Sequence, residues 1–332
     1  MKILITGGAG YIGSHTCVEL LDAGHDIVVV DSLANSSVDA ITGVKKITGK
    51  DFQFYKVDLR DEMELEKIFT AHNFDCIIHF AGLKAVGESI AMPVAYYKNN
   101  LNCTLNICTM MKKYSIKQLI FSSSATVYRS DNIMPLVENA PLGAGNPYGW
   151  SKFMCEQILR DVAVSEKDFS VVLLRYFNPV GAHKSGIIGE RPNGVPNNLM
   201  PFISQTAHGI YSEVKIFGND YETSDGTGVR DYIHVVDLAK GHVKAVDYAA
   251  KNTGCEVFNL GTGKGISVLE MINTFENINN IKVPYSIAPR RAGDNATCYA
   301  NPEKAEKILS FKANKTLDDM CKDTWRYQSG AK

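Results

Sequence analysis

Residues 1–13, MKILITGGAGYIG, combine a short apolar run with glycines spaced as GxxGxxG, at Gly7, Gly10 and Gly13. The run predicts a buried strand, and the last glycines lie where a helix is expected to begin. Glycines at such a junction permit a tight turn and let a diphosphate approach the backbone at a helix N-terminus, whose dipole favours negative charge. The stretch therefore predicts the first strand, turn and helix of a dinucleotide-binding unit.

The next apolar run supports this interpretation. DIVVV at residues 26–30 is followed by Asp31, which lies 18 residues beyond Gly13. A carboxylate at the end of the second strand accepts hydrogen bonds from an adenosine ribose and repels a 2′-phosphate, and Ser32 after it supplies no cation. The pattern therefore favours NAD over NADP as the cofactor.

A phosphate-binding P-loop is the competing interpretation of a glycine-rich turn. Its nearest candidate begins at Gly43 and ends in GKD at residues 49–51. Five residues separate the two glycines where the motif has four, and Asp51 stands where a magnesium-binding Ser or Thr is needed. This stretch therefore does not match the P-loop motif.

Further along the chain, short apolar runs alternate with amphipathic stretches, which is typical of βαβ units in a parallel sheet. The runs after the first two cover residues 52–57, 76–80, 118–123 and 170–176. From about residue 178 the sequence becomes rich in Gly, Pro and Asn, as in loops that cover a site. We expect an α/β fold: a doubly wound parallel Rossmann sheet in an NAD-binding domain, residues 1–177, and a smaller substrate-binding lobe, residues 178–332, with segments near residues 230–262 packing back onto the first.

Composition excludes several classes of protein. The 332 residues are 45% hydrophobic and 21% charged, as in globular proteins, and the net charge of −1 gives no reason to expect nucleic acid or an anionic membrane as a partner. No apolar run reaches the roughly 20 residues of a membrane span, and the N-terminus shows no secretory signal, so a cytoplasmic protein is expected. The eight cysteines form no Cys-x-x-Cys pair, so we expect no metal site and no disulfide framework.

Three residues are candidates for catalysis. Tyr148 and Lys152 lie four residues apart and share one face of a predicted helix, and Ser124 ends the preceding strand, at the edge where open α/β sheets bind ligands. A free phenol has a pKa of about 10, too high for a base near neutral pH. A lysine ammonium and an oxidised nicotinamide nearby would stabilise the phenolate, and Ser124 could hold the reacting hydroxyl.

Through the glycines, Asp31, Ser124 and the Tyr148-x-x-x-Lys152 pair, the sequence resembles the extended short-chain dehydrogenase/reductase family. The segments GGAGYIGSHT, HFAGLKAVGES, FSSSATVY, LRYFNPVGAH, NNLMPF, DGTGVRDYIHV and PRRAGD extend this resemblance over nearly the whole chain, to members that act on UDP-sugars. The resemblance implies reversible epimerisation at carbon 4 of UDP-glucose and UDP-galactose, a step of galactose metabolism, through a 4-keto sugar and a bound NAD.

The resemblance also implies the residues that bind each ligand. Those expected at the cofactor are Gly7, Gly10, Tyr11, Ile12, Gly13, Asp31, Asn35, Ser36, Asp58, Leu59, Phe80, Ala81, Gly82, Lys84, Asn99, Tyr148, Lys152 and Tyr176. Those expected at the UDP-sugar are Lys84, Ser124, Asn178, Asn198, Leu199, Phe217, Arg230, Arg291, Asp294 and Cys298. Chemistry supports the two arginines independently, because guanidinium groups form charge-assisted and often bidentate bonds to phosphate.

The sequence departs from the family pattern at two positions. Arg129 follows ATVY where the family usually has glycine, which leaves the local turn open, and Trp150 lies inside the Tyr/Lys segment. On a helix, position 150 points away from positions 148 and 152, so we expect the catalytic pair to be retained.

Three other functions use the same scaffold. Related dehydratases carry Asp-Glu just after the Ser/Thr, and this chain has Ala125 and Thr126 there, which supply no carboxylic acid. A dehydrogenase would have to release NADH in each cycle, which the sequence does not decide. A non-catalytic NAD-sensing protein is the remaining alternative, and the intact Ser124, Tyr148 and Lys152 argue against it.

Two further expectations come from the resemblance. The family forms homodimers through two helices per subunit, here near residues 93–113 and 148–166. Cys298 falls where the family places a residue beside the carbon 2 substituent of the sugar, and a small side chain there leaves room for an N-acetyl group. Neighbouring side chains of an extended segment point to opposite faces, so only Cys298 or Tyr299 can line the pocket. With Cys298 facing inward, UDP-N-acetylglucosamine and UDP-N-acetylgalactosamine become substrates.

Overall fold

The computed structural model describes residues 1–291 and 294–330. A seven-stranded parallel sheet forms its centre, with the strand order β10-β6-β5-β4-β1-β2-β3. The six apolar runs of the sequence form six of these strands, so the predicted doubly wound sheet is confirmed. The strands are β1 (Lys2–Thr6), β2 (Asp26–Asp31), β3 (Gln53–Lys56), β4 (Cys76–His79), β5 (Gln118–Ser124), β6 (Ser170–Tyr176) and β10 (Gly254–Leu260).

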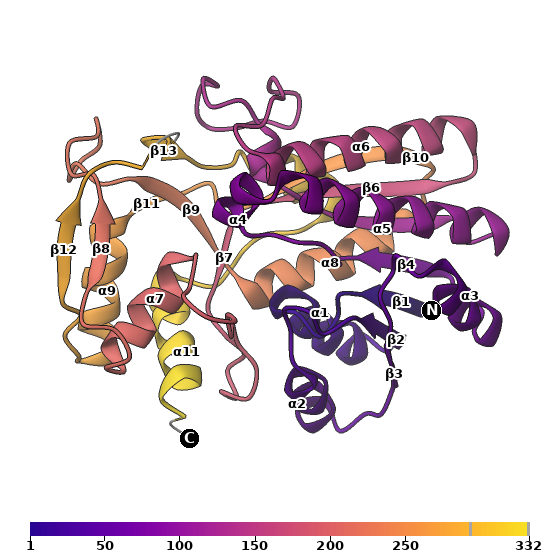
Figure 1. The fold of residues 1–332 in the computed structure, drawn as a ribbon, viewed down its shortest axis with the longest axis horizontal. Helices are drawn as coiled ribbons and strands as arrows, with labels where there is room; N and C mark the ends of the chain where they lie inside the picture. Colours follow the sequence, from indigo (N-terminus) through magenta and orange to yellow (C-terminus); the bar gives the residue numbers. More distant parts are fainter. Residues whose placement is uncertain (292–293, 331–332) are drawn as a thin grey trace.

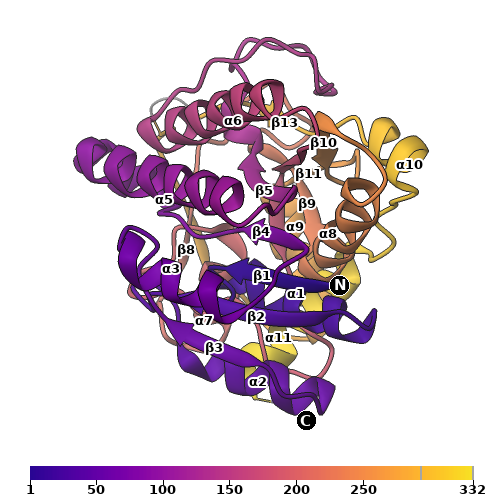
Figure 2. The ribbon, with the colours of Figure 1, turned by 90° about the vertical axis from the view of Figure 1, so that its right-hand side faces the viewer.

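Helices cover both faces of this sheet because the side chains of each strand alternate between two apolar cores (Figures 1 and 2). In β1, Ile3 and Ile5 pack toward one core, whereas Leu4 packs toward the other. The first core is closed by α1 (Tyr11–Asp22), α2 (Val38–Thr48), α8 (Val235–Ala249) and α10 (Glu303–Leu309). The second is closed by α3 (Glu62–Ala71), α5 (Pro93–Lys113) and α6 (Pro147–Ser165), with the short α4 (Val86–Ala91) leading into α5.

A smaller lobe, mostly from the C-terminal part of the chain, lies beside the carboxyl ends of the strands (Figure 1). Its own core includes Ile203, Phe275 and Met320, all buried. Its strands are β7 (Asn178–Val180), β9 (Val229–His234), β11 (Gly265–Ser267) and β13 (Thr297–Cys298) in one sheet, with β8 (Val214–Phe217) and β12 (Tyr285–Ala288) in another. Its helices are α7 (Leu199–Ala207), α9 (Val268–Asn279) and α11 (Leu317–Ser329).

The chain passes between the lobes more than once. Helix α8 and strand β10, which follow β9 of the smaller lobe, belong to the central sheet and its covering layer. Strand β10 pairs with β6 in parallel along its whole length, from Gly254 opposite Ser170 to Leu260 opposite Tyr176. The division of the chain at residues 177 and 178 stays a prediction, because α8, β10 and α10, which all come after residue 178, pack on or within the central sheet.

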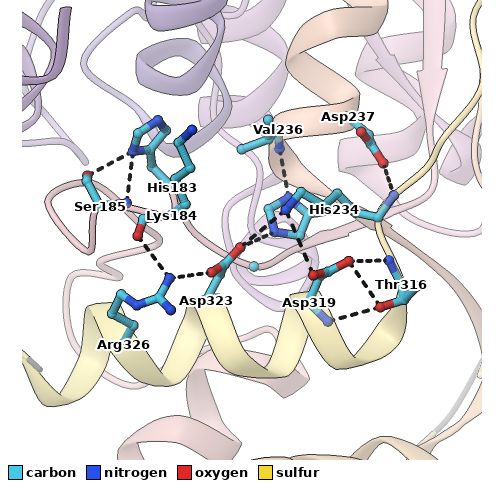
Figure 3. A network of polar contacts seen from close by, with 12 residues as sticks. His183, Lys184, Ser185, His234, Val236, Asp237, Thr316, Asp319, Asp323 and Arg326 are labelled. Atoms are coloured by element: carbon cyan, nitrogen blue, oxygen red, sulfur yellow. Dashed lines mark hydrogen bonds and ion pairs between the residues drawn. The ribbon is translucent and has the colours of Figure 1, made fainter. Parts of the chain in front are cut away.

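A polar network fixes helix α11 against the start of α8 (Figure 3). The Nδ1 atom of His234 accepts a hydrogen bond from the backbone N–H of Val236, so the proton lies on Nε2, which is 3.3 Å from the Asp323 carboxylate. Asp323 also accepts a bond of 2.8 Å from Arg326, whose guanidinium donates to the carbonyl of Lys184. Because His234 and Asp323 are buried, the network holds α11, β9 and the loop near residue 184 in one arrangement.

Among the residues that the structure describes, no helix is long and apolar enough to cross a bilayer. The eight cysteines are all free thiols. The cytoplasmic location stays a prediction.

Candidate active site

The turn between β1 and α1 has a backbone that only glycine fits. Gly7 has a φ of +72°, and a Cβ there would lie 2.7 Å from the amide nitrogen of Ala81. A Cβ on Gly13 would lie 2.4 Å from the carbonyl oxygen of Gly7. Gly10 is the N-cap residue of α1, and no side chain accepts a capping hydrogen bond there. The first turn also carries no acidic residue, so the first N–H groups of the helix remain available to an anion. This cradle fits the diphosphate of NAD.

Asp31 lies beside this turn, at the end of β2. Its Oδ2 accepts a bond of 3.0 Å from the backbone N–H of Ala9, and its Oδ1 accepts bonds of 2.8 Å from the N–H of Leu33 and the hydroxyl of Ser36. These bonds fix a buried carboxylate at the edge of the dinucleotide site. Asn35 lies in the same loop, one residue before Ser36.

The remaining residues expected at the cofactor follow neighbouring strands. Asp58 and Leu59 follow β3, Phe80 to Gly82 follow β4, and Tyr176 ends β6, so the fold places them along the carboxyl edge of the sheet. Tyr11 and Ile12 begin α1, and the hydroxyl of Tyr11 donates a bond of 2.6 Å to the carbonyl of Gly181. Asn99, on α5, donates to the side chain of Asn100.

The three catalytic candidates meet where β5 faces α6. Ser124 ends β5, and Tyr148 and Lys152 lie on the first turns of α6. The ammonium of Lys152 donates a bond of 2.7 Å to the carbonyl of Ser122 and lies 4.9 Å from the centre of the Phe121 ring. Ser124 Oγ accepts bonds from the N–H and the hydroxyl of Thr126, which leaves its own proton free to donate.

The pKa values of this cluster follow from burial. Burial lowers the pKa of Lys152, which is only 5% exposed, to about 8. Burial also raises the pKa of Tyr148 above its ordinary value, and its contact with the Ser124 hydroxyl opposes the rise. In the folded chain the ammonium bonds to the Ser122 carbonyl and the desolvation of the phenol dominates. The expected stabilisation of the phenolate by the lysine together with an oxidised nicotinamide stays a prediction.

Tyr176 has a partner that the sequence did not indicate. Its hydroxyl bonds to Nε2 of His242 on α8, and His242 Nδ1 lies 2.8 Å from the carbonyl of Leu238. Burial lowers the pKa of His242 to about 4, so the ring is neutral at physiological pH. Because Nδ1 donates to the carbonyl, Nε2 accepts from the phenol and fixes its direction.

The residues expected at the nucleotide of the substrate gather in the smaller lobe. The guanidinium of Arg291 donates a bond of 2.9 Å to the Asp294 carboxylate and lies 4.8 Å from the centre of the Phe217 ring. Arg230, on β9, lies 3.8 Å from the other oxygen of Asp294. Two guanidinium groups therefore converge on one carboxylate beside an aromatic ring. Within the PRRAGD segment, Ala292 and Gly293 lie outside the described residues.

A second carboxylate joins residues of the two lobes. Oε1 of Glu190 accepts a bond of 2.8 Å from the Asn198 side chain and lies 3.3 Å from the ammonium of Lys84. Lys84 follows β4, whereas Asn198 immediately precedes α7 and Leu199 begins it. The sequence did not indicate Glu190, which lies in a Gly/Pro-rich loop and has no motif around it. Asn178 begins β7 and is exposed.

Cys298 and Tyr299 point to different surroundings. Cys298 pairs with Arg230 in the parallel ladder of β13 and β9, and its side chain packs against the cluster that contains Val127 and Phe177. The Tyr299 ring instead lies against Gly265, with Cδ1 3.6 Å from where a Cβ would be. Of the two side chains, that of Cys298 therefore faces the residues that follow Ser124 in the chain.

The two departures from the family pattern do not disturb the cluster of Ser124, Tyr148 and Lys152. Arg129 pairs with Asp131 at the surface, and its backbone N–H donates a bond of 3.1 Å to the carbonyl of Pro141. Trp150 is 37% exposed and its ring lies near that of Phe153. It therefore points away from the face of α6 that carries Tyr148 and Lys152.

Comparisons with known proteins agree with the site. Residues 3–261 match the model of the NAD dependent epimerase/dehydratase family. The UDP-glucose 4-epimerase of Bacillus subtilis is 57% identical over 329 residues, which cover 99% of this chain and 97% of that protein. This chain is also 53% identical, over 99% of its length and 96% of the relative's, to the UDP-glucose 4-epimerase of Dictyostelium discoideum.

Solved structures give the same result. The UDP-glucose 4-epimerase of Bifidobacterium longum, in complex with NAD⁺ and UDP, superposes with a TM-score of 0.96 at 52% identity, covering 100% of this chain and 99% of that one. The UDP-Glc/GlcNAc 4-epimerase of Campylobacter jejuni superposes with a TM-score of 0.87 at 36% identity, covering 99% of each chain. The resemblance expected from the sequence is confirmed: the chain belongs to the NAD dependent epimerase/dehydratase family, together with full-length relatives that are UDP-glucose 4-epimerases.

Proposed function

We propose that the chain interconverts UDP-glucose and UDP-galactose by inverting carbon 4 of the sugar through a transient 4-keto intermediate, as a step of galactose metabolism. The observation that carries the proposal is the meeting of Ser124, Tyr148 and Lys152 at the carboxyl edge of the sheet. The larger lobe holds NAD and the smaller lobe holds the UDP-sugar, with the division near residue 177.

Tyr148 is the base in this mechanism. Its phenolate oxygen takes the proton of the sugar 4-hydroxyl, Ser124 aligns that hydroxyl with its free proton, and Lys152 holds positive charge near the phenolate. NAD bound along the glycine turn would supply the hydride acceptor for carbon 4 and a positive charge that favours the phenolate. After the ketone has turned over in the pocket, the hydride would return from the reduced cofactor to the other face of carbon 4, and Tyr148 returns the proton to the oxygen of carbon 4.

The nucleotide end of the substrate is held more firmly than the sugar. Arg230 and Arg291 converge on one point, where their guanidinium groups suit the diphosphate, and Phe217 offers an aromatic face. Firm contacts to UDP and looser contacts to the sugar permit the rotation that inversion requires. The ketone persists until it is reduced again, because Ala125 and Thr126 supply no carboxylic acid for dehydration.

Replacing the base tests this mechanism. Tyr148→Phe should lower kcat for UDP-galactose by about 10²–10⁴-fold, because positioned general acid–base groups contribute this much. Tyr285→Phe, which changes an exposed tyrosine of β12, serves as the matched control and should keep the wild-type rate. Near-normal turnover by Tyr148→Phe would assign the base to another residue.

Retention of the cofactor separates an epimerase from a dehydrogenase. Purified protein, when unfolded, should release NAD and NADH in a total of about one per chain, and steady turnover should need no added cofactor. The measurement is chromatography of the supernatant together with absorbance of free NADH during turnover. Linear accumulation of free NADH from UDP-glucose would show a net dehydrogenase instead.

The position of Cys298 supports activity on N-acetylated sugars as well. Its small side chain packs against the cluster that contains Val127, whereas Tyr299 is turned toward Gly265. A phenol at position 298 would overfill the space for a carbon 2 substituent, and overpacking typically costs about 1–3 kcal/mol or more.

Substitution of Cys298 tests this specificity. Cys298→Tyr should abolish conversion of UDP-N-acetylgalactosamine and leave conversion of UDP-galactose within a few-fold of wild type, whereas Cys298→Ser, of similar size, should keep both. Rates with the two substrates, measured side by side, provide the test. The idea fails if the wild-type protein converts UDP-galactose but neither N-acetyl sugar.

We also propose a homodimer formed through α5 and α6. Both helices carry exposed apolar side chains, including Val94, Leu105, Trp150 and Met154. These residues would be covered in a bundle of two helices from each subunit.

Light scattering at micromolar concentration should give the mass of two chains. Leu105→Glu should shift the protein toward monomer, because a carboxylate buried in an apolar interface is costly. Met63→Glu, which changes an exposed methionine of α3, should remain dimeric. A monomeric wild-type protein would reject the proposal.

A further inference from the structure

Three consecutive serines at the end of β5 each contact a residue on one of three successive turns of α6. The carbonyl of Ser122 accepts from Lys152, the hydroxyl of Ser123 donates to Glu156, and Ser124 contacts Tyr148. Positions 148, 152 and 156 are four residues apart and share one face of the helix. Glu156 is the member of this face that the proposed mechanism does not use.

Glu156 is completely buried and fully hydrogen-bonded. Its Oε1 accepts bonds of 2.5 Å from Ser123 and 2.9 Å from Nε of Arg175, and its Oε2 accepts a bond of 2.7 Å from Nη2 of Arg175. Arg175 lies on β6, is equally buried, and donates its remaining bond to the carbonyl of Glu138, with its guanidinium 4.7 Å from the centre of the Tyr128 ring. The pair is therefore a bidentate ion pair between the helix and the sheet. Nη2 of Arg160, one turn further along α6, lies 3.6 Å from the same Oε2.

Stability alone does not account for such a pair. Replacing a buried ion pair with apolar residues of similar volume is often neutral or stabilising, because the desolvation of two charges offsets their attraction. The position of the pair suggests another role. Glu156 lies one helical turn beyond Lys152. Its bond to Ser123 anchors this part of α6 to β5, between Ser122, which accepts from Lys152, and Ser124.

The groups around the Lys152 ammonium come from several elements. Burial lowers the pKa of Lys152, and Cys155, Cys103 of α5 and Glu156 oppose that lowering. His79 of β4 is neutral, because burial lowers its pKa to about 3, and burial raises the pKa of both thiols, so they are neutral too. Tyr148 faces the same site as a neutral phenol. The Glu156 carboxylate, with Arg175 and Arg160 behind it, is therefore the charged group of this set.

We infer that Glu156, held by Arg175 and Ser123, is a positioning residue for Lys152: it fixes the turn of α6 that carries the ammonium and supplies the negative charge that keeps it protonated. The inference rests on the proposed function, because loss of the Lys152 proton is observed as the alkaline limb of the pH–rate profile. Arg175 holds the carboxylate in place and is also a positioning residue.

A matched pair of substitutions separates charge from shape. Glu156→Gln keeps the shape and removes the charge, so the alkaline limb of kcat for UDP-galactose should move to lower pH by roughly one unit. Glu156→Asp keeps the charge on a shorter side chain, so kcat should fall while the limb stays near its wild-type position. In Glu156→Gln/Arg175→Met both charges of the pair are absent. The alkaline limb should then lie between its positions in Glu156→Gln and in the wild type. A wild-type limb in Glu156→Gln would overturn the inference.

The control for loss of stability is Asp323→Asn, which removes the charge of a buried carboxylate in the network of Figure 3, on α11. It should lower the melting temperature and leave the alkaline limb unmoved. If this variant moves the limb as far as Glu156→Gln does, the effect is a general consequence of destabilisation and the inference is wrong. If Glu156→Gln does not fold, Glu156→Gln/Arg175→Met is measured instead. An alkaline limb at its wild-type position in that double variant would also overturn the inference.

Melting temperature against pH gives a measure that does not depend on turnover. The folded-state pKa of Lys152, about 8, is below its unfolded value of 10.5, so folding stability rises with pH between these values as the penalty of the buried charge disappears. In Glu156→Gln this rise should begin at lower pH, and the added substitution Lys152→Met should abolish the shift. An unchanged onset would overturn the inference. Wild-type protein inactive on UDP-galactose would instead overturn the proposed function and leave this measurement to decide the role of Glu156.

Discussion

The close approach of α1 to the first strand is the constraint on which the rest of the molecule depends. No side chain fits at Gly7 or Gly13, because a Cβ at either position would lie within 2.7 Å of neighbouring backbone. This approach sets the start of α1, and α1 packs directly against α8. Helix α8 in turn carries His242 to the hydroxyl of Tyr176, so the backbone of one turn determines where an aromatic side chain stands on the far strand.

Local sequence was sufficient where function requires a particular backbone or a short spacing. The glycine turn, the carboxylate at Asp31 and the Tyr148/Lys152 pair are such cases, and the structure places each of them at the carboxyl edge of the sheet. The inner strands of the first half could also be found, because a fully buried strand must be apolar throughout.

Contacts between distant segments could not be found in this way. Glu190 meets Lys84 across 106 residues and Glu156 meets Arg175 across 19, and neither acid lies in a motif. Tertiary packing also affects the pKa of Tyr148, because burial raises it in the folded chain and the Lys152 ammonium bonds to a backbone carbonyl, which the Tyr/Lys spacing does not reveal. The division of the chain into two lobes was equally hard to place, because β10 returns to the central sheet after β7 and β9 have entered the smaller lobe.

That return has a consequence for how the chain acquires its structure during synthesis. Strand β6 lies between β5 and β10, so the ribosome must release residues 254–260 before β6 can complete its second set of backbone hydrogen bonds. Domains that are continuous in sequence fold in the order in which they emerge, N-terminal first. In this chain the outer edge of β6 stays open while the intervening segments of the smaller lobe emerge, so nascent chains that lack β10 present a bare edge strand to their neighbours.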